Sequence, residues 1–386
     1  MIKRLLTEKI VQLSKKFPVV SVTGPRQSGK TTLIRSAFPD YHYEVLEEPD
    51  TMLLAKNDPR KFLESGPRMI IDEIQRVPDL FSYIQTLTDK TNLTGQFIIS
   101  GSLSFLFNQH ISQSLAGRVA VTSLLPFSLE ELESQTAGIS NYESLLFRGF
   151  YPRIYDKDIA PFDFYPSYIQ TYIERDIRLI QYVQDLTLFI RFVKLCAGRI
   201  GQLLNLSSLA NDCGISVNTA KSWLSLLETS FVVFLLQPHH INFNKRLVKM
   251  PKLYFFDTGL ASSLLEIRSE SQLLSHYLKG PLFENLIIAE LIKNRFNKGF
   301  NSNCYFWRDN KGNEIDCLIE KSNGLTPVEI KSGSTFTTDF FRSMNYWNKL
   351  SGNSGENSYV IYGGLTNREL NEGKLISWKG FLKYLS

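Results

Sequence analysis

The sequence predicts an α/β protein of more than one domain, and three observations carry this prediction. The chain has 386 residues, of which 43% are hydrophobic and 21% are charged, so it can build ordinary globular cores. Between residues 18 and 105, short apolar runs alternate with helix-like segments, a pattern typical of a parallel sheet covered on both faces. A glycine-rich loop of the GxxxxGK(S/T) type follows the first apolar run.

The apolar runs are the expected strands of this sheet: Val19–Thr23, Met69–Ile71 and Phe97–Ser100. Each is short and apolar throughout, which favours strands that are buried on both faces. A helix is expected at Thr32–Phe38, directly after the glycine-rich loop. We place this first domain at residues 1–160.

Two changes of pattern divide the rest of the chain. Pro161 and Pro166 open a segment rich in long aliphatic and aromatic side chains at helical spacing. A mixed pattern of helix and strands returns near residue 276, so we expect a helical middle segment at 161–275 and a C-terminal α/β domain at 276–386. The elements expected in the last domain are a helix at Leu282–Asn294 and strands at Cys304–Arg308, Glu314–Glu320 and Pro327–Lys331.

The glycine-rich loop predicts a phosphate site. Its two glycines let the backbone fold tightly around phosphate oxygens, and successive N–H groups then form an anion nest. Lys30 brings a mobile positive charge to the β- and γ-phosphates, and the Thr31 hydroxyl is placed to ligate Mg²⁺. The helix that follows directs the positive end of its dipole at the same phosphates. The expected ATP-binding residues are Gly24, Pro25, Arg26, Gln27, Ser28, Gly29, Lys30, Thr31 and Thr32.

Two acids at the end of the second strand supply the other half of this site. Asp72 is expected beside the magnesium ion, and Glu73 is expected to orient or deprotonate the attacking water. At the end of the third strand, Ser100 or Ser102 could contact the γ-phosphate. An ordinary strand-to-loop turn explains these two serines equally well.

Arg118, in Leu115-Ala-Gly-Arg118, is a candidate arginine finger. Such a residue reaches the γ-phosphate, usually from a neighbouring subunit, and stabilises charge in the transition state. A solvated or ion-paired arginine is the more common alternative. A finger in trans would require a homo-oligomer, so the sequence leaves open whether Arg118 acts within one chain or between chains.

A longer series of motifs occurs in a fixed order. It consists of Gly24–Thr32, Asp72-Glu73, Ser100-Gly-Ser102, Leu115-Ala-Gly-Arg118 with Leu125-Pro-Phe-Ser128, Gly149-Phe-Tyr-Pro152 and Tyr172-Ile-Glu-Arg175-Asp176. This series resembles the prokaryotic AAA-type ATPases that carry a C-terminal domain of unknown function. The resemblance covers nearly the whole chain, and its later motifs are more specific than the first two. One departure is Arg153, where an acidic or apolar residue is more usual.

The resemblance implies three parts. They are an AAA-type P-loop ATPase core, a winged-helix segment and a C-terminal α/β domain that is restriction-endonuclease-like and related to the PD-(D/E)xK nucleases. The loop and the acids predict ATP and Mg²⁺ as cofactors, and the nuclease-like pattern makes DNA or RNA a candidate partner.

Residues 207–228 have the pattern of a helix-turn-helix, with Ser216 as the cap of the second helix. The apolar run Phe231–Leu236 fits a wing strand. A helix that reads DNA bases usually carries several Arg, Asn or Gln side chains, whereas this helix offers only Asn218 and Lys221. We therefore favour a module that packs between domains over direct DNA binding.

Four charged residues stand out in the C-terminal domain: Glu284, Asp316, Glu329 and Lys331. Residues two apart on a strand face the same side, so Glu329 and Lys331 should project together. Asp316 lies on the preceding expected strand, and Glu284 lies on the helix expected to cover the sheet. We expect the three carboxylates to converge within metal-bridging distance, with Lys331 beside them.

Such a cluster has the chemistry of a metal-dependent nuclease. Three carboxylates can hold one or two Mg²⁺ or Mn²⁺ ions that activate water, while Lys331 stabilises the developing charge. The ordered set of acids and lysine after a helix is moderately specific. A solvated charged strand, or an inherited nuclease fold that no longer cleaves, remains the alternative.

Charge, cysteine content and apolar runs indicate which partners and which cell compartment to expect. The net charge of +5 permits a polyanionic partner without arguing for one. The cysteines form no CxxC pair and no zinc spacing, which suits a reducing cytoplasm. No signal-peptide pattern and no bilayer-spanning apolar run is present, so we expect a cytoplasmic protein without a membrane partner. The cysteines are Cys196, Cys213, Cys304 and Cys317.

Three functions fit these observations. The leading hypothesis is an ATPase whose nucleotide cycle controls a nuclease-like domain that acts on nucleic acid. The alternative is an ATP-gated, non-catalytic switch that binds a protein or DNA partner through its winged-helix and C-terminal domains. An ATP-dependent unfoldase is a weaker third hypothesis, because no aromatic pore-loop pattern is evident.

Overall fold

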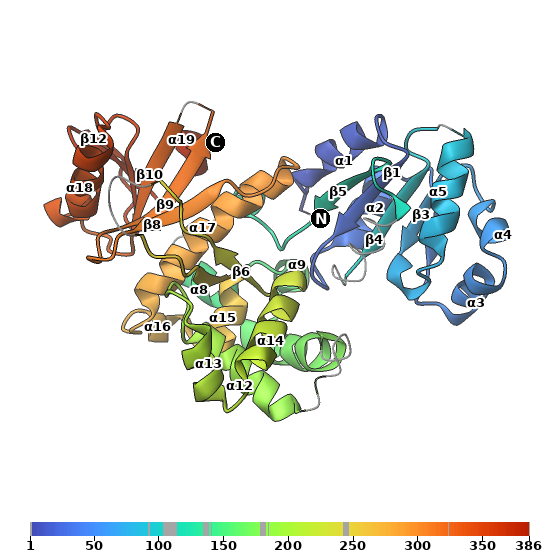
Figure 1. Ribbon diagram of the computed structural model, residues 1–386, viewed down its shortest axis with the longest axis horizontal. Helices are drawn as coiled ribbons and strands as arrows, with labels where there is room; N and C mark the ends of the chain where they lie inside the picture. Colours follow the sequence, from blue (N-terminus) through green and yellow to red (C-terminus); the bar gives the residue numbers. More distant parts are fainter. Residues whose placement is uncertain are drawn as a thin grey trace.

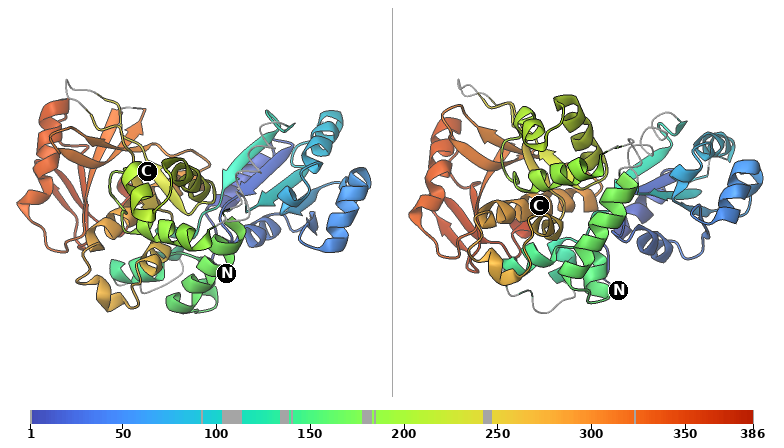
Figure 2. Two further views of the ribbon diagram at one scale, coloured as in Figure 1. Left: turned by 60° about the horizontal axis from the view of Figure 1, so that its bottom comes forward. Right: turned by 90° about the horizontal axis from the view of Figure 1, so that it is seen from below.

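The structure, a computed structural model, describes residues 2–91, 93–102, 114–133, 139, 141–177, 183, 185–241, 247–322 and 324–385, with the backbone alone at residues 174–177. An N-terminal sheet and a C-terminal sheet lie on opposite sides of the molecule, and a helical middle region lies between them (Figures 1 and 2). The long helix α17 (Lys279–Asn297) contacts both sheets.

A parallel sheet forms the first domain, with the strand order β2–β3–β4–β1–β5. The carboxyl ends of its strands therefore meet at one edge. In the sheet, β4 lies between β1 and β3, although it follows both in the sequence. The strands are β1 (Val19–Thr23), β2 (His42–Val45), β3 (Met69–Asp72), β4 (Phe97–Gly101) and β5 (Val119–Ser123).

Helices cover both faces of this sheet, as the apolar runs predict. Alternate residues of each strand join opposite layers: Ile71 and Ile99 pack in one core cluster, and Ile70 and Ile98 pack in the other. One face is covered by α3 (Pro49–Asn57), α4 (Pro59–Leu63) and α5 (Leu80–Thr91), and the other by α1 (Leu6–Ser14) and α2 (Lys30–Ala37). The short 3-10 helix η1 (Ile74–Arg76) follows β3.

The middle region is mainly helical. Its first helices, including a segment that the sequence assigns to the first domain, pack into a core shared with the rest of the middle region. The chain leaves the first sheet after β5. Leu146 and Ile154, which the expected boundary at residue 160 places in the first domain, are therefore fully buried in the core of the middle region. The helices are α7 (Leu129–Glu133), α8 (Tyr142–Arg148), α9 (Pro152–Asp156), α10 (Pro161–Tyr168), the π-helix η2 (Ile169–Ile177), α12 (Leu186–Ala197), α13 (Leu206–Cys213), α14 (Val217–Thr229), α15 (Thr258–Leu264) and α16 (Glu270–Leu273).

A helix-turn-helix followed by a hairpin lies inside this region. The Ser216 side chain accepts a hydrogen bond from the Thr219 N–H at the start of α14, so the predicted cap is confirmed. After α14, β6 (Val233–Leu236) pairs with β7 (Lys252–Phe255) in an antiparallel hairpin, which we call the wing. The expected wing strand is therefore present, two residues shorter at its start.

The C-terminal sheet has the strand order β12–β13–β11–β10–β9–β8. Strands β8, β9 and β10 form an antiparallel meander, whereas β11 runs parallel to β10. Helix α17 precedes the meander, and α18 lies between β10 and β11 in the sequence. The elements are β8 (Cys304–Arg308), β9 (Glu314–Lys321), β10 (Gly324–Lys331), η3 (Thr338–Phe341), α18 (Arg342–Ser351), β11 (Tyr359–Tyr362), β12 (Arg368–Leu370), β13 (Gly373–Ser377) and α19 (Leu382–Leu385).

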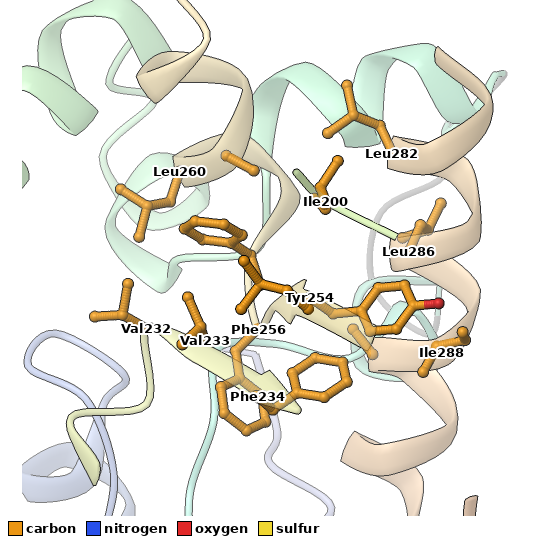
Figure 3. Packing of buried hydrophobic residues seen from close by; sticks show 14 of the residues in the cluster. Ile200, Val232, Val233, Phe234, Tyr254, Phe256, Leu260, Leu282, Leu286 and Ile288 are labelled. Atoms are coloured by element: carbon orange, nitrogen blue, oxygen red, sulfur yellow. The ribbon is translucent and has the colours of Figure 1, made fainter. Parts of the chain in front are cut away.

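The wing is joined to the C-terminal sheet. The segment after β6 bridges to β8 between Pro238 and Phe306, and the segment before β7 bridges to the residue that follows β8, between Leu247 and Asp309. One core cluster extends from the middle region into the C-terminal sheet. Figure 3 shows this packing, with the Tyr254 ring reaching from the wing towards α17. Within the described ranges, no helix is both long and apolar enough to cross a bilayer.

Candidate nucleotide site and C-terminal acidic cluster

The glycine-rich loop leaves the carboxyl end of β1 in a backbone conformation that requires glycine. Gly24 has φ 147°, and a Cβ atom there would lie 2.1 Å from the Leu124 carbonyl oxygen. Gly29 has φ 92° and precedes the first residue of α2. The loop is therefore packed against the exit of β5, and its shape is fixed by backbone geometry.

Lys30 lies at the start of α2 and is only 6% exposed. Its Nζ donates to the carbonyl oxygens of Gly24 at 3.0 Å and Pro25 at 2.9 Å. Burial lowers the pKa of Lys30, and the charges of Glu73 and Asp72 oppose that shift. The ammonium thus lies inside the loop and faces the two acids at the end of β3.

Asp72 and Thr31 meet as the sequence predicts. The Thr31 hydroxyl donates to Asp72 Oδ2 at 2.6 Å, although 41 positions separate the two residues. Tyr43, on the edge strand β2, also donates to Oδ2, at 3.2 Å, while the Ser100 hydroxyl donates to Oδ1. Hydroxyl and carboxylate oxygens are the ligands that Mg²⁺ prefers, so Thr31 and Asp72 fit that ion.

Glu73 has an unusual backbone conformation for a residue with a side chain, with φ 55°. Its carboxylate accepts hydrogen bonds from Gln75 Nε2 at 2.5 Å and from the Ser102 hydroxyl at 3.1 Å. Strain of this kind often occurs at functional sites. Ser100 and Ser102, the two candidate phosphate sensors, each bind one of the acids, so both serines hold the acidic half of the site in place.

Arg118 lies at the wrong edge of the sheet for a role in its own chain. It immediately precedes β5, and its carbonyl accepts from the Val19 N–H at the amino-terminal end of β1. Its guanidinium makes two hydrogen bonds with the carboxylate of Asp89, at 2.5 and 2.9 Å. Since the loop leaves the opposite end of β1, a finger role in cis is wrong. A role in trans stays a prediction.

Sequence reasoning missed a buried arginine behind the loop. Arg4 donates to the Ser28 carbonyl at 2.6 Å, to the Leu125 carbonyl at 2.7 Å, and to Glu131 Oε1 at 3.0 Å. The side chains of Arg4 and Glu131 are 8% and 0% exposed. This ion pair ties the N-terminal segment, the loop and the chain after β5 together. No local pattern around Arg4 signals it, because its partners are distant in the sequence.

The second helix of the helix-turn-helix offers a modest polar face. Asn218 and Lys221 are exposed, while Trp223 and Leu227 are buried in the core of the middle region. The two side chains that the sequence singles out are therefore accessible. Contact with DNA stays an expectation.

The meander of the C-terminal sheet brings Asp316, Glu329 and Lys331 together, as the sequence predicts. Lys331 Nζ lies 2.6 Å from Glu329 Oε2 and 3.9 Å from Asp316 Oδ2. The Ile330 N–H donates to the same Asp316 oxygen at 2.8 Å. Burial, with a smaller contribution from the charge of Asp316, raises the pKa of Glu329 to about 8, although the charge of Lys331 opposes the shift. Its Oε1 atom is buried and has no hydrogen-bond partner among the described residues.

Glu284 does not complete a metal site, so the predicted convergence of three carboxylates within metal-bridging distance is wrong. Its Oε1 atom accepts from Lys252 Nζ at 3.0 Å and from the Tyr254 hydroxyl at 2.5 Å. Across the described ranges, no group of three or more His, Cys, Asp or Glu side chains could hold a metal ion. The physical reason is that Lys252, a wing residue that the sequence assigns to the middle segment, binds the Glu284 carboxylate.

Glu284 is nevertheless electrostatically close to the other acids. The pKa of Glu284 is raised to about 7, mainly by burial and in part by the charge of Asp316, while the charge of Lys252 opposes the shift. The cluster therefore combines the three predicted acids with Glu314 and Lys252, which sequence reasoning did not include. Glu314 lies on β9, two residues before Asp316, whereas Lys252 lies on β7 of the wing, so only the fold brings Lys252 to the cluster.

Comparisons with known proteins match consecutive parts of the chain. Residues 16–133 match the family described as AAA domain. Residues 139–271 and 279–381 match two families, each described as a domain of unknown function (DUF8612 and DUF4143).

Two curated relatives match most of the chain. They are the uncharacterized protein Rv2008c of Mycobacterium tuberculosis and the uncharacterized protein Mb2031c of Mycobacterium bovis. Each is 32% identical over 326 residues, which cover 82% of this chain and 71% of the relative. The chain belongs to their family. Its first domain is an AAA-type P-loop ATPase domain, as the loop and the acids predict.

Solved structures similar to this AAA-type chain include the Walker-type ATPase PABY2304 of Pyrococcus abyssi and the AMPPCP-bound DnaA of Aquifex aeolicus. The first has a TM-score of 0.47 and 12% identity, and covers 69% of this chain and 96% of its own. The second has a TM-score of 0.31 and 14% identity, and covers 58% of this chain and 86% of its own.

Proposed function

We propose that this chain binds ATP together with Mg²⁺ at Gly24–Thr32 and hydrolyses it. The observation that carries the proposal is the contact between the Thr31 hydroxyl and the Asp72 carboxylate, at 2.6 Å. These oxygens suit Mg²⁺, which keeps few protein ligands and binds substrate phosphates as well. When bound, the ion neutralises charge on the phosphates.

Backbone and side-chain groups of this chain supply the other roles in ATP binding and hydrolysis. Backbone N–H groups of Gly24–Thr32 and the start of α2 hold the phosphate oxygens. Lys30 exchanges its two bonds to loop carbonyls for bonds to phosphate. Glu73, which Gln75 and Ser102 hold in place, orients the attacking water and accepts its proton.

A cavity beside the loop is the proposed position of the adenosine. Its volume is about 280 Å³, and Gly29 and Thr32 line it on the side of the loop. Phe127 and Pro152, from the start of the middle region, line another part of it. Largely apolar walls with a few polar groups are typical of sites for a purine ring.

Lys30→Ala tests nucleotide binding. Because Lys30 is the flexible charge inside the loop, the variant should lose most of its affinity for a fluorescent ATP analogue. Lys16→Ala, which removes an exposed lysine from the same domain, is the matched control and should bind like the wild type. Equal affinity of Lys30→Ala and the control would refute binding at this loop.

We further propose that the nucleotide state acts on the C-terminal domain through α17. Glu290 on this helix accepts from the Leu129 N–H at 2.5 Å, and Lys293 donates to the Phe127 carbonyl at 3.0 Å. Phe127 lines the proposed adenosine cavity. At the other end, Glu284 of the same helix belongs to the acidic cluster. This arrangement supports an ATP-gated switch, whose output is a protein or nucleic-acid partner bound by the middle and C-terminal domains.

Cleavage of nucleic acid is the second candidate output. Two observations support it: Asp316, Glu329 and Lys331 lie together on the meander, and Glu329 has a buried oxygen that no described residue contacts by a hydrogen bond. A nuclease assay with Mn²⁺ on single- and double-stranded DNA and on RNA, with and without ATP, tests it. Cleavage should be lost in Asp316→Asn and retained in the exposed control Asp339→Asn. Absence of cleavage would leave the non-catalytic switch as the proposed output.

A further inference from the structure

A lysine of the wing lies inside the acidic cluster of another domain. Lys252 is the first residue of β7, and its side chain is only 4% exposed. Its Nζ lies 3.0 Å from Glu284 on α17 and also pairs with Glu314 on β9. The middle region thus contributes a cation to a cluster whose carboxylates all belong to the C-terminal domain.

The cluster needs this positive charge. Carboxylates from α17, β9 and β10 lie in one cluster, and negative charges that close together repel one another. Each lysine pairs with two of the carboxylates: Lys331 contacts Glu329 and Asp316, whereas Lys252 contacts Glu284 and Glu314. The Arg308 guanidinium supplies a further charge, 2.9 Å from the second oxygen of Glu314.

The two halves of the cluster differ in how their carboxylate oxygens are paired. One oxygen of Glu284 accepts hydrogen bonds from both Lys252 and the Tyr254 hydroxyl. These two bonds occupy the lone pairs of that oxygen, which is therefore closed to a metal ion. In the other half, Glu329 Oε1 is buried and has no hydrogen-bond partner among the described residues.

We propose that Lys252 is a built-in cation of the C-terminal cluster, and that its ammonium excludes Mg²⁺ or Mn²⁺ from it. Tyr254, two residues further along β7, contacts the same Glu284 oxygen. With Lys252 in place the cluster is an ion-pair network and not a metal site, which favours the non-catalytic switch over Mn²⁺-dependent cleavage as the output of this domain.

Thermal unfolding with and without Mn²⁺, in the absence of nucleotide, tests the proposal. Lys252→Met keeps the length of the side chain and removes its charge. Its melting temperature should rise with Mn²⁺, since the metal replaces the missing ammonium, whereas the wild type should not respond. Lys221→Met, at an exposed position on α14, is the matched control and should behave like the wild type. The gained response should disappear when Glu329→Gln is added.

A second variant covers the case in which Lys252→Met does not fold. Lys252→Met combined with Glu314→Gln removes one charge of each sign, so the buried acids stay balanced. It should show the same rise with Mn²⁺, which Glu329→Gln should again remove. Folded variants without a Mn²⁺ response would overturn the proposal. A wild-type response that Glu329→Gln removes would overturn it too, whatever the variants do, because the site would then bind metal with Lys252 in place.

Discussion

Asp72 receives hydrogen bonds from three side chains and from one backbone N–H. Thr31, Tyr43 and Ser100 come from different elements of the first domain, and the Glu73 N–H adds a fourth bond at 3.1 Å. These bonds fix the direction of both carboxylate oxygens. The oxygen that faces Thr31 is consequently held in the position where the proposed magnesium ion needs a ligand.

Stability should depend on pH through Glu329. Its pKa in the folded protein is about 8, above the ordinary value of 4.5, mainly because the side chain is buried. A raised pKa favours the protonated acid in the folded state, so its contribution to stability is complete below pH 4.5. That contribution is lost as the pH rises through about 8. Without divalent metal, the unfolding free energy of the wild type should therefore fall over this range.

Urea denaturation of Glu329→Gln across the same pH range measures this contribution. The variant should lose much of the downward slope, because glutamine does not titrate. Glu320→Gln, at an exposed position of β9, should keep the wild-type slope. Equal slopes for Glu329→Gln and the wild type would contradict the buried, raised pKa.

At the scale of one residue, the sequence predicts contacts that belong to a motif and misses those that only the fold creates. The meeting of Thr31 with Asp72 follows from the loop and the acid strand. Tyr43 and Arg4 carry no such pattern, yet both are bound to this site. Lys252 is the clearest omission, because its carboxylate partners lie beyond an expected domain boundary.

Helix α17 carries a buried ion pair where it contacts the chain that leaves the first sheet. Glu290 and Lys293 lie 2.8 Å apart with side chains 0% and 2% exposed, and Lys293 Nζ lies 3.8 Å from the Phe150 ring centre. Removing one partner of a buried ion pair is strongly destabilising, because the other charge is then left buried without compensation.

Lys293→Met should therefore lower the unfolding free energy by about 3–5 kcal/mol. Lys298→Met, on the exposed residue that follows α17, should leave it unchanged. Chemical denaturation of both variants compares them directly. A loss no larger for Lys293→Met than for the control would show that the pair does not anchor α17.

At the scale of elements, the sequence predicts the buried strands best. The expected strand at Glu314–Glu320 is observed as Glu314–Lys321, and the expected helix at Leu282–Asn294 extends to Lys279–Asn297. The sequence pattern predicts neither β2 nor β5. Each is an edge strand with partly exposed positions, so its apolar pattern is weaker than that of β1 or β4.

For the whole molecule, the domain order is predictable but the way the parts interlock is not. Two of the expected domains form one unit, because the middle region and the C-terminal sheet share a core and the wing bridges to β8. Such long-range packing leaves no periodic signal in the sequence. For the same reason, the sequence cannot tell that Arg118 lies far from the loop of its own chain.

The central claim is that the first domain hydrolyses ATP with Glu73 as the residue that orients water. Its most direct test is Glu73→Gln, with Glu64→Gln at an exposed position as the control. Nucleotide binding and turnover are measured on the same samples with Mg²⁺ present. Glu73→Gln should bind ATP like the wild type, because the loop, Lys30 and Asp72 are intact, while its kcat falls by about 10²–10⁴-fold. Hydrolysis by Glu73→Gln at the wild-type rate would contradict the account.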